Sequence, residues 1–175
     1  MRQYHSHFSH YLNILTMAIP PSLKYAFTIN VELAPAIDFG ATFSGDRRFI
    51  AITGGSIEGP RLTGKVLSGG GDWNAVRPDG VVHVFAKYSI QASDGTPISI
   101  TNEGFGRASQ SGIKAIFDGT DASMIDGDER WYTKTWPRFE VAPGKWDWLN
   151  TTCFIGDLLP PTSPDRVVIN IYEIL

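Results

Sequence analysis

The chain of 175 residues is long enough for one domain, and its 15 basic and 18 acidic residues give a formal net charge of −3. Glycine (18 residues) and proline (11 residues) are frequent, aromatic residues make up 12% of the chain, and charged residues only 19%. This composition excludes a disordered chain, which has few aromatic residues, and a helical bundle, whose helices do not tolerate so much glycine and proline.

The first 21 residues differ from the rest, and we expect them to form a flexible N-terminal extension. The apolar stretch of residues 11–19 is interrupted by polar residues, is too short to span a membrane, and has no clear small-residue cleavage site after it. Cys153 is the only cysteine, so no internal disulfide can form and nothing indicates an oxidising compartment. We therefore expect a cytoplasmic protein with one domain over residues 22–175.

Short strands separated by turns are predicted from residue 25 onward. Residues 25–33 alternate, with the odd-numbered side chains from Tyr25 to Leu33 on one apolar face. Further strands are expected over residues 48–52, 61–67, 81–92, 97–102, 131–135, 146–155 and 166–174. At most one short helix is expected, within residues 106–118. About eight strands at short spacing are typical of an all-β protein, either a closed barrel or a two-sheet sandwich.

Two segments depart from simple strand patterns. Residues 54–71 hold seven of the 18 glycines, and glycine within strands marks a bulge, a barrel corner, or the close approach of a ligand. Residues 146–150 alternate bulky and polar side chains, and a strand there would place Trp146, Trp148 and Asn150 on one face.

Several motifs occur together in a recognisable order along the chain. They are Gly59-Pro60-Arg61-Leu62, Gly69-Gly70-Gly71-Asp72-Trp73, Lys87-Tyr88-Ser89-Ile90, Trp136-Pro137-Arg138-Phe139-Glu140 and Trp148-Leu149-Asn150. With these motifs, the chain from about Ala26 to its C-terminus resembles domain-of-unknown-function family 3237. The resemblance implies a single antiparallel β-barrel with a central pocket, and some fungal members look like cofactor-independent cyclases of natural-product pathways. The chain departs from the family at Phe85-Ala86-Lys87, where Asp-x-Arg is usual, and this departure implies a specialised pocket.

Two carboxyl groups and one lysine are the candidate catalytic groups. Glu58 lies within the glycine-rich segment and Asp72 directly follows it. A carboxyl desolvated among aromatic side chains has a raised pKa that suits a general acid. Capping of a turn is the structural alternative for Asp72. Lys87 lies in the middle of a predicted strand, where it either faces solvent or enters the pocket and holds a substrate oxygen.

Aromatic and amide side chains are the candidate substrate-binding groups. An aromatic wall can orient a ring or stabilise developing positive charge, although buried tryptophan is more often a core residue. The candidates are Trp73, Trp148, Asn150, Tyr132, Asn102 and Phe85. We expect neither a metal nor a cofactor, because no histidine, cysteine and carboxylate spacing matches a metal site and no dinucleotide or phosphate-loop motif is complete.

The functional hypothesis is a cofactor-independent cyclase or isomerase that acts on a small hydrophobic intermediate of secondary metabolism by general acid/base catalysis. It depends on the family resemblance more than on the residues. The alternatives are a non-catalytic barrel that binds and carries a small molecule, and a structural domain whose barrel is filled by side chains. The slight negative charge argues against nucleic-acid and membrane partners, and assembly into a homo-oligomer stays open.

Overall fold

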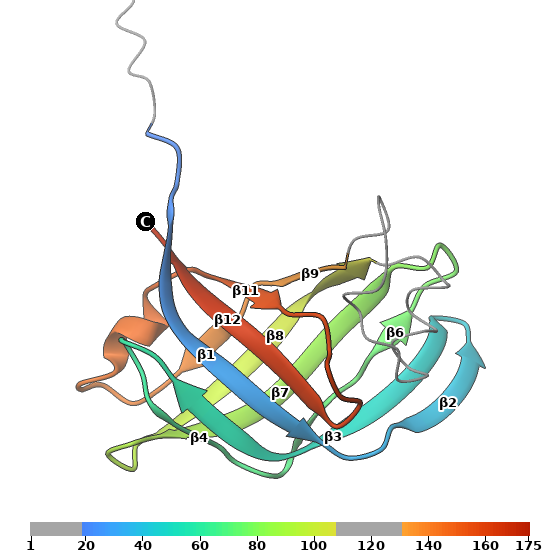
Figure 1. The fold of residues 1–175 in the computed structure, drawn as a ribbon, viewed down its shortest axis with the longest axis horizontal. Helices are drawn as coiled ribbons and strands as arrows, with labels where there is room; N and C mark the ends of the chain where they lie inside the picture. Colours follow the sequence, from blue (N-terminus) through green and yellow to red (C-terminus); the bar gives the residue numbers. More distant parts are fainter. Residues whose placement is uncertain (1–18, 108–130) are drawn as a thin grey trace, which may run out of the picture.

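A computed structural model describes residues 19–107 and 131–175, and these residues form a closed antiparallel β-barrel (Figure 1). This confirms the predicted all-β barrel. The strands are β1 (Leu23–Leu33), β2 (Ile37–Thr42), β3 (Gly45–Glu58), β4 (Gly64–Val66), β5 (Gly70–Asp72), β6 (Ala75–Val76), β7 (Val82–Ala92), β8 (Pro97–Arg107), β9 (Tyr132–Thr135), β10 (Arg138–Glu140), β11 (Phe154–Leu158) and β12 (Arg166–Ile174).

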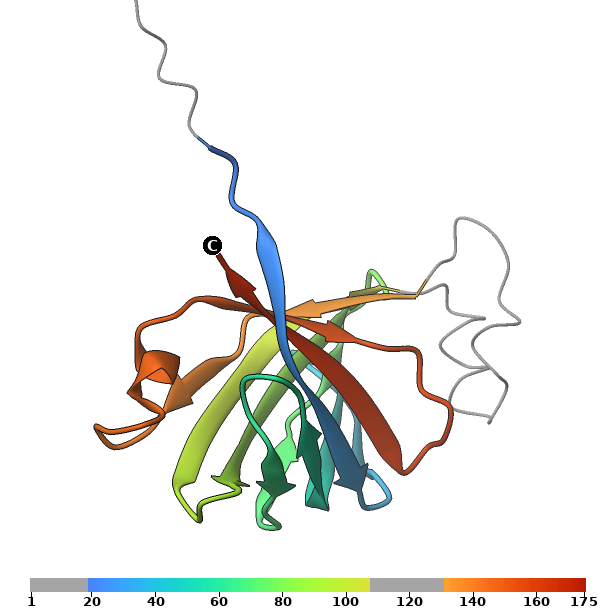
Figure 2. The same cartoon turned by 60° about the vertical axis from the view of Figure 1, so that its left-hand side comes forward.

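The barrel has eight strand positions, and the last position is shared by three short strands. The ring runs from β7 through β8, β9, β11, β12 and β1 to β3. Each of β4, β5 and β6 then pairs with both β3 and β7 and closes the ring. β2 pairs with β3, and β10 pairs with β8, beside the ring. Figure 2 shows β1 (blue) and β12 (red) crossing in front of β7 and β8 (green to yellow).

The concentration of glycine has a structural reason at this closing position. A Cβ atom at Gly64 would lie 2.1 Å from the carbonyl oxygen of Gln91, and one at Gly70 would lie 2.4 Å from Tyr88 Cβ. Real Cβ atoms do not approach other atoms so closely, so β4 and β5 require glycine where they pack against β7. Close packing of strands therefore accounts for these glycines without a ligand.

Strand β1 confirms the predicted alternation except at its start. The register with β12 shifts between Tyr25 and Phe27, so one extra residue enters the strand as a β-bulge. Ala26 and Phe27 are consequently both buried, whereas Tyr25, expected on the inner face, is 39% exposed.

Residues 146–155 do not form the expected strand. Asp147–Asn150 form a 3₁₀ helix, η3, and β11 begins only at Phe154. The helix turns Leu149 into the core, where it is 1% exposed, so these side chains do not alternate between the two faces of a sheet. A short helix is expected from the sequence within residues 106–118. Residues 106 and 107 belong instead to the end of β8, and residues 108–118 lie outside the described residues. Most of the expected N-terminal extension also lies outside them.

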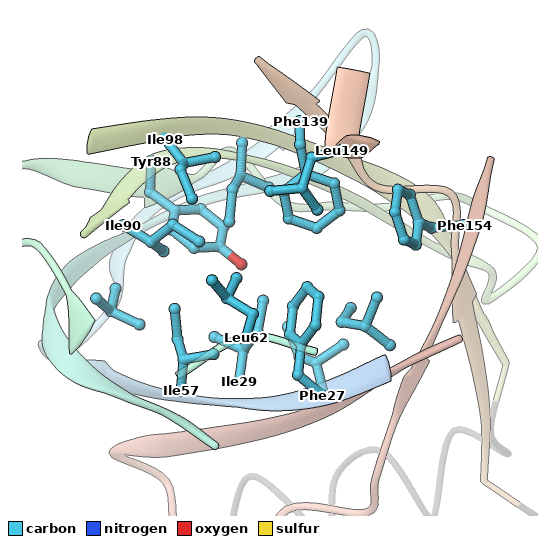
Figure 3. Packing of buried hydrophobic residues seen from close by; sticks show 14 of the residues in the cluster. Phe27, Ile29, Ile57, Leu62, Tyr88, Ile90, Ile98, Phe139, Leu149 and Phe154 are labelled. Atoms are coloured by element: carbon cyan, nitrogen blue, oxygen red, sulfur yellow. The ribbon is translucent and has the colours of Figure 1, made fainter. Parts of the chain in front are cut away.

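One end of the barrel is packed with apolar side chains. Phe27, Ile29, Ile57, Ile90, Ile98 and Phe139 converge there and are nearly inaccessible to solvent (Figure 3). β10 and η3 cover this end, with the Phe139 ring in edge contact with Phe27 and Phe154. Tyr88 belongs to this cluster, and its hydroxyl points toward the barrel centre (Figure 3).

Candidate functional site

The other end of the barrel contains a pocket of about 180 Å³. The same strands that pack the core line this pocket with their next inward residues. Val31 follows Ile29 on β1, Ala86 precedes Tyr88 on β7, and Ile169 precedes Ile171 on β12. Most of the lining is apolar, and few polar side chains enter it, which is the usual character of a small-molecule site.

One row of paired residues crosses the pocket wall on four neighbouring strands. Asp72 of β5 lies between Ile50 of β3 and Ala86 of β7, and Ala86 is in turn opposite Asn102 of β8. All four residues line the pocket. Ala86, which lies between Asp72 and Asn102 in this row, contributes only a methyl group to the pocket wall.

The Asp72 carboxyl is the main electrostatic feature of the pocket. Its Oδ1 accepts a hydrogen bond from the Phe85 backbone N–H at 2.9 Å, and its Oδ2 accepts a longer one from the Asn74 side chain at 3.4 Å. Burial raises the pKa of Asp72 above its ordinary value of 3.8, and these hydrogen bonds oppose the shift only in part. The protonated acid is therefore favoured to a higher pH than in a solvated aspartate.

Two further polar atoms in the pocket are buried without a hydrogen-bond partner. They are the Tyr88 hydroxyl, on a residue 4% exposed, and Asn102 Oδ1, on a residue 1% exposed. Both residues line the pocket. Burial raises the pKa of Tyr88 above its ordinary value of 10.0, so its hydroxyl keeps the proton at neutral pH. Buried polar groups are nearly always paired, so these two need an explanation.

Among the residues predicted from the sequence, Asp72 and Asn102 are brought together in the pocket. Lys87 and Phe85 are outside it, because alternation on β7 turns Ala86 and Tyr88 inward and their neighbours outward. The departure from the family at Phe85 and Lys87 therefore does not change the pocket lining, contrary to the expectation from the sequence. Their outward direction follows from strand geometry alone.

The remaining predicted site residues also lie outside the pocket lining. Glu58 is exposed at the end of β3, and Trp73 is 40% exposed and packs on Phe49 with ring centroids 5.0 Å apart. Tyr132 is likewise 40% exposed, beneath the Arg107 guanidinium.

Trp148 and Asn150 are far from the pocket, near the packed end. The Trp148 ring contacts Phe154 and lies 4.2 Å from the Arg61 guanidinium carbon, measured to the ring centroid. The Asn150 side chain hydrogen-bonds both backbone groups of Val141, at 3.0 and 2.9 Å. These contacts give Asn150 a structural role in holding the chain after β10.

Sequence reasoning missed Tyr88, Asn74 and Ala86 as pocket residues. For Tyr88 and Ala86 a signal was present, because Val82, Val84, Ala86, Tyr88 and Ile90 alternate with polar or outward residues. That period of two predicts which side of β7 faces inward. For Asn74, which follows β5 in a turn-rich segment, we find no such signal.

Within residues 19–107 and 131–175, no three metal-binding side chains are grouped as a metal site would require. No helix in the same residues is long and apolar enough to cross a membrane.

A closed antiparallel barrel that is packed at one end and hollow at the other has room for a small molecule in its hollow end. The chain belongs to the DUF3237 family of proteins of unknown function, whose profile matches residues 21–174. The resemblance seen in the sequence is thereby confirmed.

Relatives with and without a known activity are similar to the chain. A UPF0311 protein of Rhodopseudomonas palustris strain TIE-1 is 32% identical over 154 residues, which cover 87% of this chain and 95% of that protein. The crystal structure of a conserved protein of unknown function from Rhodopseudomonas palustris has a TM-score of 0.78 at 28% identity, covering 90% of this chain and 99% of the other. The hydroalkoxylation enzyme phnH of Penicillium herquei is 34% identical over 82 residues, covering 47% of this chain and 54% of the enzyme.

Proposed function

We propose that the protein is a cofactor-independent enzyme that cyclises or isomerises a small hydrophobic molecule, with Asp72 as its general acid and base. The observation that carries this proposal is the carboxyl of Asp72, which lines an apolar pocket and has a raised pKa. The similarity to a fungal hydroalkoxylation enzyme supports a reaction in which a hydroxyl group adds to a carbon–carbon double bond.

Such an addition needs only one group that gives and takes back a proton. Asp72 transfers its proton to one alkene carbon, and the π electrons form the new C–H bond. The substrate hydroxyl oxygen then bonds to the carbocation, and the proton leaving that oxygen returns to the Asp72 carboxylate. The product is an isomer of the substrate, so the step needs no oxidant or reductant.

The surroundings of Asp72 fit both of its protonation states. Burial favours the neutral acid before the transfer, whereas the Phe85 N–H and the Asn74 amide stabilise the carboxylate formed after it. The apolar walls limit access of water, which would otherwise compete with the substrate hydroxyl for the carbocation.

The test uses an ortho-prenylated phenol, which contains a hydroxyl group and an alkene in one small apolar molecule. In D₂O we expect one deuterium atom per cyclised product, because the Asp72 proton exchanges with solvent between turnovers. Asp72→Asn should lower turnover by about 10²- to 10⁴-fold, the usual contribution of general acid/base catalysis. Glu58→Gln is the matched control, since Glu58 is a carboxyl residue outside the pocket.

Full turnover by Asp72→Asn would remove the general acid from the proposal. Tight binding of such phenols by the wild-type protein with no turnover of any would favour instead a non-catalytic binding barrel, which the mostly apolar lining would also suit.

A further inference from the structure

We propose that the deep end of the pocket is a binding site for a hydroxyl group of the ligand, formed by the Tyr88 hydroxyl and the Asn102 side-chain amide. The ligand is then a small apolar phenol or alcohol. This inference rests on the proposed function, because it assigns a substrate class to the same pocket.

The two side chains lie close enough to hold a single group. On the paired strands β7 and β8, Tyr88 is opposite Ile100, and Asn102 is opposite Ala86. Tyr88 and Asn102 are thus diagonal neighbours on the inner face, and such positions are about 7–8 Å apart, within reach of long side chains. Both residues line the same pocket as Ala86.

The position of the pair is deep in the pocket. Along β7, Tyr88 borders the packed core, whereas Val82 and Val84 line the pocket further along the strand, in the direction away from the core. The charged lining residues among those described are Asp72, Arg107 and Arg166, and both arginines are exposed at strand ends. Among residues 19–107 and 131–175, none therefore places a cation at the deep end that could pair with a ligand carboxylate or phosphate.

The hydrogen-bonding capacity of the pair fits a hydroxyl group better than other neutral groups. A ligand hydroxyl can donate a hydrogen bond to Asn102 Oδ1 and accept one from Tyr88, which satisfies both unpaired atoms. A ligand carbonyl or ether can only accept, so it would leave Asn102 Oδ1 unpaired. An unpaired buried polar group is unfavourable, so the pocket should discriminate between these ligands.

Three matched ligands test this inference by calorimetric titration at pH 7: 2-naphthol, 2-methoxynaphthalene and naphthalene. The wild-type protein should bind 2-naphthol about tenfold more tightly than either analogue, equivalent to about 1.4 kcal/mol. An apolar pocket without hydroxyl recognition would instead favour the less polar analogues.

Tyr88→Phe and Asn102→Leu should each remove most of this preference. Both replace a side chain that has an unpaired buried atom with an apolar one of similar size, so neither should lower the melting temperature. Thr133→Val is the control, because Thr133 also lines the pocket but has no unpaired side-chain atom. Its variant should keep the preference.

The inference is overturned if the wild-type protein binds the three ligands equally, or if the preference survives in both variants. Asp72→Asn separates this result from the proposed function, because it should lose turnover and still prefer 2-naphthol. Hydroxyl preference without any turnover leaves the inference standing and removes the proposed enzyme.

Discussion

Replacement of Ala86 by isoleucine tests whether the barrel is hollow at one end and packed at the other. Ala86 lines the pocket on the inner face of β7. Ala92 lies on the same face of the same strand at the packed end. Both alanines belong to the buried core cluster, Ala86 at 7% and Ala92 at 3% exposure, but only Ala86 lines the pocket. The same substitution therefore adds carbon atoms to empty space at one position and to filled space at the other.

The expected changes in the free energy of unfolding have opposite signs. Isoleucine adds three carbon atoms, and their burial contributes about 2.4 kcal/mol, at roughly 0.8 kcal/mol each. Loss of side-chain rotamers subtracts about 0.5–1 kcal/mol, so Ala86→Ile should gain about 1.5 kcal/mol. Ala92→Ile should lose about 1–3 kcal/mol, because overpacking forces neighbouring side chains and backbone to shift.

Urea denaturation measures these two changes, and calorimetric titration with 2-naphthol measures the pocket. Ala86→Ile should bind 2-naphthol at least about tenfold more weakly, whereas Ala92→Ile should bind it as the wild type does. If Ala86→Ile destabilises the protein as much as Ala92→Ile, or leaves binding unchanged, the space beside Ala86 is not open.

Three other variants separate structural roles from functional ones. Because the pKa of Asp72 is raised, the wild-type free energy of unfolding should fall as pH rises from 3.8 through the folded-state pKa, by at most about 1.4 kcal/mol per pH unit. Urea titrations at several pH values should show a flatter profile for Asp72→Asn. Arg61→Met should lower the free energy of unfolding by about 1–3 kcal/mol, because Glu173, which is 6% exposed, loses the guanidinium whose Nε lies 3.4 Å from its Oε1. Adding Glu173→Gln should recover most of this loss, and no recovery would argue against the ion pair. Asn150→Ala should lower the free energy of unfolding, measured by urea denaturation, by about 1–3 kcal/mol, because the hydrogen bonds to Val141 are lost. A loss of 2-naphthol affinity in this variant would contradict a purely structural role.

The fold was largely predictable because local patterns agree with it. The alternation of residues 25–33 and 81–92 corresponds to β1 and β7, and turns separate them from their neighbours. The bulge at Ala26 was not predictable, because Tyr25 and Phe27 on either side of it are both aromatic and the alternation therefore looks continuous in the sequence. The division of the closing position among three short strands was not predictable either, because β4, β5 and β6 have only two or three residues each, too few for an alternating pattern.

The site was predictable only in part. Asp72 and Asn102 line the pocket from neighbouring positions on either side of β7. Lys87 does not, because the alternation along β7 turns Tyr88 inward and Lys87 outward. Lysine is a more reactive side chain than tyrosine and so is the stronger catalytic candidate by chemistry, but strand geometry excludes Lys87 from the pocket. Trp148 was misplaced because η3 replaces the expected strand, so its alternation with Asn150 carried no information about a shared face.

The separation of packed and hollow ends has a consequence for how this barrel can diverge. Ile29 and Ile90 belong to the core alone, whereas Val31 and Ala86, two and four positions away on the same strands, belong to the core cluster and also line the pocket. Substitutions at lining residues can change the shape of the pocket while the packed end stays intact, so the hollow end can vary more freely than the packed end. Relatives at about 30% identity can thus share this barrel and differ in the shape of its pocket.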